Sequence, residues 1–300
     1  KTTSKCQISG DKKLKTIISL GYLPPVNKLQ KIGSKLEEDH FYPTELIYSN
    51  ISKLAQLNTI VDKKILFPKE YPYTSSTTKV LRENFKELYV DCKKVINLSS
   101  NDLIIDIGSN DGNLLRNFKN YHRVLGVTPE KIGRLAIKEG INTIIKYFDK
   151  KTSNLILKKF GKAKIITATN VFAHIENVNL LMQNLLRVLK DDGIFISESH
   201  YLVSLIETNQ YDTIYHEHLR YYSLTSLKYL FKKYGMEIIH AKKINTHGGS
   251  IRVYAARKKR FKINKSVKKI LNYEKKFLNW KTFNNFKKKV VDSKLELYSI

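Results

Sequence analysis

The sequence has few cysteines, little proline or glycine and no long hydrophobic run, and each shortage excludes a class of protein. Its two cysteines, Cys6 and Cys92, cannot build a disulfide framework and fit a reducing compartment. With 6 prolines and 13 glycines in 300 residues, long flexible linkers are not expected. Neither a stretch of about 18 apolar residues nor a signal segment is present. We therefore expect a soluble, cytoplasmic protein without a membrane span.

Acidic residues are also scarce, since 54 lysines and arginines face 27 acidic residues and give a net charge of +27. Basic surfaces are typical of nucleic-acid binding. Lysine outnumbers arginine, however, and asparagine, isoleucine and tyrosine are abundant, as an AT-rich coding sequence would impose, whereas guanine and phosphate readers are preferentially arginine. We therefore expect no dedicated nucleic-acid surface and keep an RNA-binding or RNA-modifying protein as the weaker alternative. The charge favours anionic ligands, including nucleotide sugars.

The chain divides into four parts by pattern. Residues 1–76 carry short apolar pieces broken by turn signals, which indicates a small irregular N-terminal lobe. Apolar residues at helical spacing predict a linking helix over 77–98. Residues 99–258 form the core, and the lysine-rich residues 259–300 have the pattern of one or two exposed helices.

The core pattern alternates strands with helices, which predicts an α/β fold with a parallel sheet covered on both faces. The alternating segments are 103–107, 113–118, 123–127, 131–139, 141–145, 153–160, 163–168, 180–189 and 193–198. After a helix over 225–234, segments 236–243 and 250–255 are expected to pair as a hairpin. The sequence therefore predicts a mostly parallel sheet with an antiparallel end.

A glycine loop follows the first strand of this core. Asp106 ends the strand, and Gly108, Asn110 and Gly112 lie in the turn before the next segment. Ligands of open α/β sheets bind at the carboxyl ends of the strands, where glycine permits close backbone approach. The dinucleotide fingerprint is not met because Asn110 replaces its second glycine. S-adenosylmethionine (SAM) fits better, since it needs no phosphate cradle. A tight turn with a left-handed asparagine is the structural alternative.

Six of the eight histidines lie between residues 174 and 247. His240 falls inside a predicted strand and is set aside as structural. The other five are expected on or near the ligand-facing loops: His174, His200, His216, His218 and His247. A zinc site is disfavoured because His216 and His218 diverge in a regular helix and no cysteine is near. With Tyr215 and Glu217, this cluster indicates a proton-transfer site.

The motifs of this sequence resemble those of the SAM-dependent sugar C-methyltransferases, which methylate C3 of nucleoside diphosphate 4-keto-deoxyhexoses. The resemblance is carried by residues 211–224, which contain Tyr-His-Glu-His, and by 247–253, with support from 66–76, 106–112 and 170–174. It implies a Rossmann-like class I SAM-methyltransferase fold with a small N-terminal lobe. It also implies a cytoplasmic transferase of deoxysugar biosynthesis whose partner is a nucleotide sugar.

The resemblance also implies residue roles. His218 is the expected base that removes the C3 proton and gives an enolate, with Glu217 and Tyr215 as its companions. His174 and Tyr71 or Tyr73 are expected to contact substrate oxygens, while His216 is expected to be structural or to support the residues that touch the substrate. The expected SAM residues are Asp106, Gly108, Asn110, Gly112, Thr128 and Asn170. The expected substrate residues are His247, Gly248, Ser250 and Arg252.

Several family positions differ here. The family's N-terminal lobe binds zinc through two Cys-x-x-Cys pairs, and the matching residues are Cys6, Ser9, Ser49 and Ser52, so we expect no zinc. Thr128 stands where the family has a ribose-binding glutamate. Relatives continue beyond the segment that matches 265–300 into a second Rossmann-like C-terminal domain, which we expect to be lost here or removed by truncation. These departures keep open a second hypothesis, a degenerate non-catalytic homologue that binds a nucleotide sugar or a protein partner. The sequence does not indicate the oligomeric state.

Overall fold

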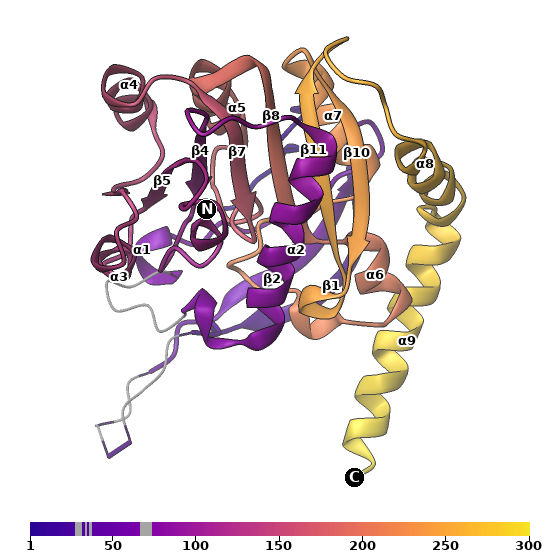
Figure 1. The fold of residues 1–300 in the computed structure, drawn as a ribbon. Helices are drawn as coiled ribbons and strands as arrows, with labels where there is room; N and C mark the ends of the chain where they lie inside the picture. The colour runs from indigo at the N-terminus through magenta and orange to yellow at the C-terminus, as the bar shows by residue number, and fades with distance from the viewer. Residues whose placement is uncertain (28–31, 34, 36–37, 67–73) are drawn as a thin grey trace.

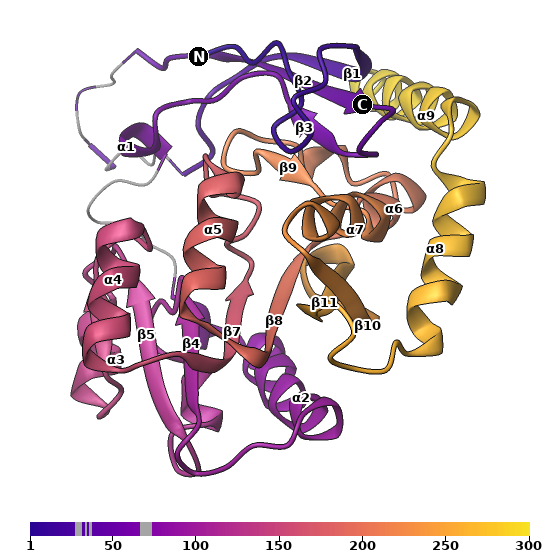
Figure 2. The same cartoon turned by 90° about the horizontal axis from the view of Figure 1, so that it is seen from above.

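A seven-stranded sheet forms the centre of the molecule, and a smaller four-stranded sheet lies beside it (Figures 1 and 2). The structure is a computed structural model that describes residues 1–27, 32–33, 35, 38–66 and 74–300. In these residues no helix combines the length and the apolar character needed to cross a membrane.

The large sheet has the strand order β10-β11-β8-β7-β4-β5-β6. Its parallel strands are β4 (Leu103–Ile107), β5 (Arg123–Thr128), β6 (Thr143–Ile145), β7 (Ala163–Thr169) and β8 (Leu189–His200). Strand β11 (Ser250–Arg257) runs antiparallel to β8, and β10 (Met236–Ile244) runs antiparallel to β11. The predicted α/β fold with an antiparallel end is confirmed. Strand β4 is buried along its whole length, as expected for a parallel strand covered on both faces.

Helices cover both faces of this sheet (Figure 2). The helices are α2 (Lys79–Val95), α3 (Gly133–Lys138), α4 (Lys150–Lys159), α5 (Val178–Val188), α6 (Leu202–Glu207) and α7 (Leu224–Lys233). Helix α2 buries the face that carries Phe85, Leu88 and Cys92, as its helical spacing predicts. The helix expected over 113–118 is wrong: only the 3-10 turn Leu115–Asn117 forms there. Three residues after Phe118, the chain already turns at Tyr121 toward β5, which leaves room for about one turn.

The N-terminal lobe is more regular than expected. Strands β1 (Leu14–Leu23), β2 (Tyr42–Ser49) and β3 (Ala55–Leu57) form an antiparallel sheet, and the short α1 (Lys63–Leu66) follows. The fourth strand, β9 (Arg220–Tyr221), comes from the core and pairs with β3. The lobe and the core therefore share a sheet.

The C-terminal residues form α8 (Lys265–Phe277) and α9 (Trp280–Tyr298). Two helices form, as expected, but both bury part of their surface instead of being fully exposed. Helix α9 packs against the lobe through Phe283, whose ring lies 4.9 Å from that of Tyr48. The carboxylate of Glu274 on α8 is buried and accepts hydrogen bonds from Tyr201 and from the backbone N–H groups of Leu224 and Thr225. The tail is thus fastened to both the core and the lobe.

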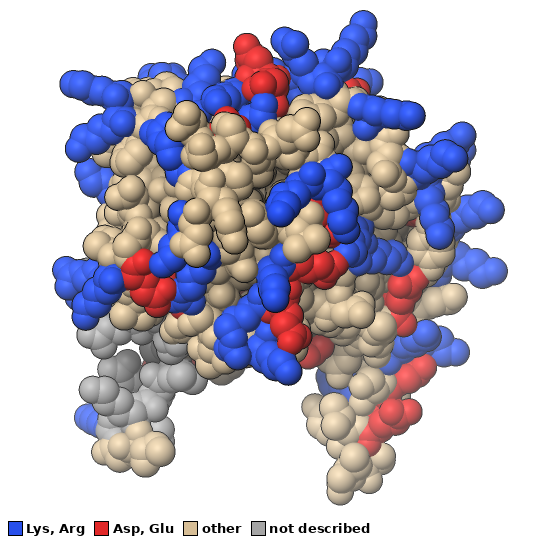
Figure 3. All heavy atoms as spheres, viewed as in Figure 1, with Lys and Arg blue, Asp and Glu red and all other residues tan. Residues whose placement is uncertain are grey.

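The positive charge is widely distributed. On the face shown in Figure 3, lysine and arginine side chains lie over most of the visible elements and are interspersed with acidic groups. On this face the charges do not gather into one stripe.

Replacing Glu274 by alanine should lower the free energy of unfolding by about 3 kcal/mol, because it leaves buried donors at the start of α7 without an acceptor. Urea denaturation measures this change. Glu274→Gln keeps one acceptor oxygen and should lose less. Glu296→Ala, at an exposed position of α9, is the matched control and should change stability by no more than about 0.5 kcal/mol. Equal stability of the wild type and Glu274→Ala would contradict this role.

Candidate active site

A cavity of about 630 Å³ opens at the carboxyl ends of β4, β5, β7 and β8. The glycine loop after β4 lines one part of it, and the histidine cluster lines another. Its volume lies in the range of small-molecule sites, and its position is where open α/β sheets bind ligands. The glycine loop and the histidine cluster, predicted separately from the sequence, therefore line the same cavity.

The glycine loop forms the first half. Gly108 adopts φ +77°, and a Cβ there would lie 2.8 Å from Val171, so only glycine fits. Asn110 lines the cavity in a left-handed conformation with φ 49°, and its side-chain oxygen accepts the backbone N–H of Ser75 at 3.0 Å. Asp106 lines the cavity as predicted and accepts a hydrogen bond from Thr167 at 2.6 Å. Asn170, also left-handed with φ 54°, lies on the cavity wall.

Two of the expected SAM residues, Gly112 and Thr128, do not line the cavity. Gly112 is not in the cavity wall: a Cβ there would lie 2.8 Å from Ile141, so its role is close packing. Thr128 is fully buried outside the wall, and its hydroxyl donates to the carboxylate of Glu130. Glu130 does line the cavity. The acidic group near this strand end is therefore supplied two residues later than the family position.

The residues after β6 were missed from the sequence. Tyr147, Phe148 and Asp149 line the cavity, and Asp149 caps α4 by accepting the N–H of Thr152 at 2.8 Å. Their position directly after a predicted strand was the available signal. An aromatic ring and a carboxylate at a strand end are suited to a flat ring that carries amino groups.

His218 has a defined tautomer. Its Nδ1 lies 3.1 Å from the carbonyl oxygen of Thr213, which can only accept, so Nδ1 carries the hydrogen. Nε2 is then the acceptor, and the Tyr215 hydroxyl donates to it at 3.3 Å. Both side chains line the cavity. The predicted base therefore presents a lone pair beside a phenol.

His174 and Glu217 complete this half of the cavity. His174 Nδ1 donates to the backbone carbonyl of Glu217 at 2.8 Å, and its ring lies 5.0 Å from that of His218. The Glu217 carboxylate accepts a hydrogen bond from Asn27 of the N-terminal lobe at 2.6 Å. The lobe therefore contributes a contact to the site.

Burial keeps these imidazoles neutral. It lowers the pKa of His174 to about 4 and that of His218 well below its ordinary value, with neighbouring histidines lowering the latter further. Burial has the opposite effect on a carboxyl group and raises the pKa of Asp106 to about 7; the hydrogen bond from Thr167 opposes the rise and Glu198 adds to it. Neutral imidazoles can accept a proton.

Most of the expected substrate residues lie elsewhere. His247 lines the cavity, but Gly248 and Ser250 do not. The Gly248 carbonyl accepts from Gln210 at 2.6 Å, and the Ser250 hydroxyl donates to the Thr246 carbonyl at 3.0 Å. Both residues therefore shape the bend that carries His247.

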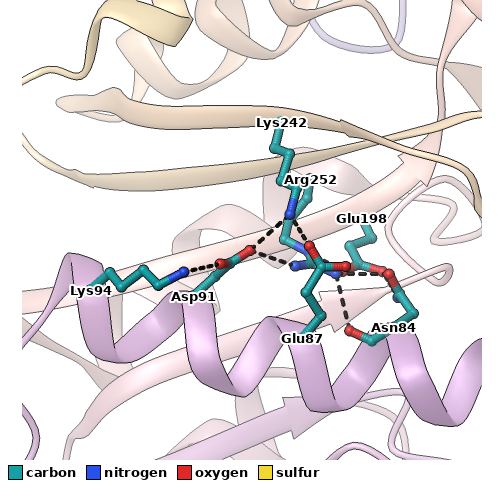
Figure 4. A network of polar contacts seen from close by, with 7 residues as sticks. All are labelled: Asn84, Glu87, Asp91, Lys94, Glu198, Lys242 and Arg252. Carbon is teal, nitrogen blue, oxygen red and sulfur yellow. Dashed lines mark hydrogen bonds and ion pairs between the residues drawn. The ribbon is translucent and has the colours of Figure 1, made fainter.

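The substrate-binding role expected of Arg252 is also wrong, because its guanidinium is fully buried under α2 (Figure 4). It pairs with Glu198, donates to the Asn84 side chain at 2.8 Å and lies 3.2 Å from Asp91. A buried arginine with three partners has no free donor set for a substrate. Its role is to hold α2 on the sheet.

Three further positions complete the comparison with the sequence. His216 lies outside the cavity wall and contacts Thr44 at 3.0 Å, so it anchors the lobe, in line with the structural role expected for it. Tyr71 and Tyr73 lie outside the described residues. His200, expected on or near the ligand-facing loops but given no role, lines the cavity.

The residues present fit SAM. Among the described residues, three buried polar groups of the wall have no hydrogen-bond partner: the hydroxyls of Ser109 and Ser199 and the amide nitrogen of Asn184. Buried polar groups are normally paired, so a ligand with polar atoms is expected there. Asp106 and Glu130 add carboxyl groups suited to the amino group and ribose hydroxyls of SAM.

Three family models match the chain. A "Methyltransferase domain" matches residues 80–241, a "Putative zinc binding domain" matches 6–67, and a "C-methyltransferase C-terminal domain" matches 245–300. The last match qualifies the expectation that the C-terminal domain is lost, because residues 245–300 resemble it.

One curated relative agrees with these matches. The chain is 30% identical over 254 residues to the C-methyltransferase NovU of Streptomyces niveus, which covers 84% of the chain and 60% of NovU. The chain thus spans about three fifths of this curated relative. A magnesium protoporphyrin IX methyltransferase from Synechocystis, solved with bound SAH, superposes with a TM-score of 0.47 and 13% identity over 59% of this chain and 83% of its own. A SAM-dependent methyltransferase from Anabaena variabilis gives 0.43 and 18% over 58% and 84%.

The lobe does not fit zinc, although the zinc binding model matches it. The four family positions do lie near one another, but they are joined by hydrogen bonds: Cys6 contacts Ser52 at 3.2 Å, Ser52 N–H donates to Ser49, and Ser49 donates to Asp11 at 2.9 Å. Ser9 accepts the N–H of Asp11 at 3.2 Å. One thiol with serine hydroxyls cannot form a tetrahedral thiolate site.

Purified protein should therefore contain much less than one zinc ion per chain, and EDTA should not change its thermal midpoint. Metal analysis and a thermal melt with and without EDTA measure this. The triple variant Ser9→Cys/Ser49→Cys/Ser52→Cys rebuilds the thiolate set and should bind about one zinc. Stoichiometric zinc in the wild type, with a lower midpoint after EDTA, would refute the prediction.

SAM affinity should rise with pH through about 7, because only the ionised form of Asp106 attracts a cationic ligand. The ionised fraction of such a group grows about tenfold between about pH 6 and 8 and sets the size of the effect. Calorimetry across this range measures it. Asp106→Asn should remove this component and keep the pH dependence of the ligand's own amino group. An identical profile for both proteins would contradict the assignment.

Proposed function

Because the chain belongs to the SAM-dependent C-methyltransferase family, we propose that it transfers a methyl group to C3 of a 4-keto-sugar nucleotide. The observation that carries the proposal is the shared cavity. Both the glycine loop and His218 line it, and His218 Nε2 has a lone pair. A base and a methyl-donor site in one cavity are what methylation of an acidic carbon requires.

The base begins the reaction. A hydrogen on the carbon beside a ketone is acidic because its removal gives an enolate. His218 Nε2 takes this proton, and the electrons of the C–H bond form the enolate. Its Nδ1–H remains bonded to the Thr213 carbonyl, which fixes the ring and its tautomer.

The oxygen of the enolate needs a donor. A neutral imidazole with a lowered pKa is too weak to remove a carbon-bound proton unaided, so the developing negative charge must be stabilised. Tyr215 is the hydroxyl donor beside the base, and we assign it this role. Glu217 is held by Asn27, and we assign it to a sugar hydroxyl.

SAM, when bound, supplies an electrophilic methyl group to the carbon that has lost its proton. Asp106 would hold its amino group and Glu130 its ribose, in place of the role expected of Thr128. Gly108 lets the backbone approach the ligand, and Phe148 with Asp149 would hold the adenine. The anionic nucleotide of the substrate suits the basic protein.

His218→Ala should lower methyl transfer by at least about a hundredfold, since a positioned base contributes that much or more. The assay is mass spectrometry of a nucleoside diphosphate 4-keto-deoxyhexose incubated with SAM, in which the product gains one methyl group. SAM affinity, measured by calorimetry, should be unchanged, because His218 is assigned to the substrate half of the cavity.

Product formation by His218→Ala at the wild-type rate would refute the assigned base. Wild-type protein that binds the nucleotide sugar but neither binds SAM nor forms product would instead support the non-catalytic alternative.

A further inference from the structure

Four histidine rings form a continuous row along the cavity. The ring of His218 lies 5.0 Å from that of His174 and 4.9 Å from that of His200, and the ring of His200 lies 6.0 Å from that of His247. They come from four separate segments: the ends of β7 and β8, the loop before β9, and the bend between β10 and β11. The fold has thus brought together side chains that lie up to 73 residues apart in the sequence, from His174 to His247.

His200 differs from its neighbours in its bonding. His174 and His218 each use Nδ1 to hold a backbone carbonyl. Within the described part of the chain, His200 has ring contacts with His218 and His247 but no hydrogen bond. It lines the cavity and is only partly buried, so neither of its nitrogens is committed to holding the fold.

His247 lies at the outer end of the row. It is exposed and has a left-handed backbone with φ 50°, an uncommon conformation for histidine. The following bend fits tightly, since a Cβ on Gly249 would lie 2.6 Å from Ser204. Strain of this kind is characteristic of functional positions, and here it holds an imidazole at the rim.

The proposed reaction creates a need for such a row. Each turnover breaks one C–H bond and leaves its proton on His218, while the methyl group arrives with the positive charge of a sulfonium. The products are the methylated sugar, neutral S-adenosylhomocysteine and one proton. That proton must leave a partly buried imidazole before His218 can act again.

We propose that His200 is the proton outlet of this site, taking the proton from His218 and passing it to His247 and solvent. The inference rests on the proposed function. In each transfer an N–H bond breaks on one ring and forms on the next, so no other reactant is needed.

The electrostatics support an outward transfer. Burial lowers the pKa of His200 to about 4, His247 and His174 lower it further, and Asp212 opposes them. The same cause lowers the pKa of His218. Burial therefore penalises the protonated form of both rings, which favours passage of the proton toward the exposed rim at His247.

The test is His200→Phe, which keeps a ring and removes both nitrogens. The substrates are the thymidine and uridine diphosphate 4-keto-deoxyhexoses with SAM. If His200 acts after the base, the first turnover in a rapid-quench experiment should keep its rate and amplitude. The steady-state kcat should fall roughly tenfold to a hundredfold with little change in KM. Added imidazole should restore kcat in His200→Gly.

His122→Phe is the matched control, because His122 lies at the opposite end of the sheet, where it contacts the Ser99 carbonyl, and this variant should keep the wild-type kcat. Wild-type kcat in His200→Phe would overturn the outlet while leaving the proposed function intact. Loss of the first turnover, with no rescue by imidazole, would show a structural role and overturn it as well. No methyl transfer by the wild type would sink the proposed function, and the outlet with it.

Discussion

The pairing of β9 with β3 is the constraint on which the site depends. It aligns Tyr221 with Ala55 and Arg220 with Gln56, only two residues after His218. Between them, the Leu219 carbonyl accepts the N–H of Leu57 at 3.1 Å, and the Leu219 N–H donates to the Ala173 carbonyl at 3.2 Å. The base is therefore held between the lobe sheet and the loop after β7, and it cannot shift without breaking backbone hydrogen bonds on one side.

Burial sets the electrostatics of the cavity. Side chains enclosed by the lobe and the core are shielded from water, and shielding penalises every charged form. Imidazoles become neutral and Asp106 keeps a proton to higher pH. The permanent charge of Arg252 is paired with Glu198 beneath α2 (Figure 4). Carboxyl groups of Asp106, Glu130 and Glu217 nevertheless line the cavity, so a cationic methyl donor would meet acidic groups there.

The sequence predicted what depends on local pattern. Alternating apolar segments gave the parallel sheet, and the position of Asp106, His174 and His218 after strands or near them placed these residues in one cavity. It could not predict β9, because a two-residue strand has no period of its own. Nor could it tell that Arg252 points under α2, because the sequence does not show which helix covers that face of β11. The shift from Thr128 to Glu130 depends on the path of one loop.

The lobe lacks three of the four thiols of a tetrahedral zinc site, so its packing bears on its stability. A small antiparallel sheet cannot bury enough apolar surface alone, which is why such modules often need zinc. Here the missing surface comes from elsewhere in the chain. Phe283 and Phe286 of α9 and Leu205 of α6 join Leu46 and Tyr48 in one buried cluster. Because β9 continues the same sheet, the packing of the lobe also holds the segment that follows His218. The stability of the lobe and the position of the base are therefore set by the same contacts, so a loss of α9 packing should weaken catalysis even though α9 does not line the cavity.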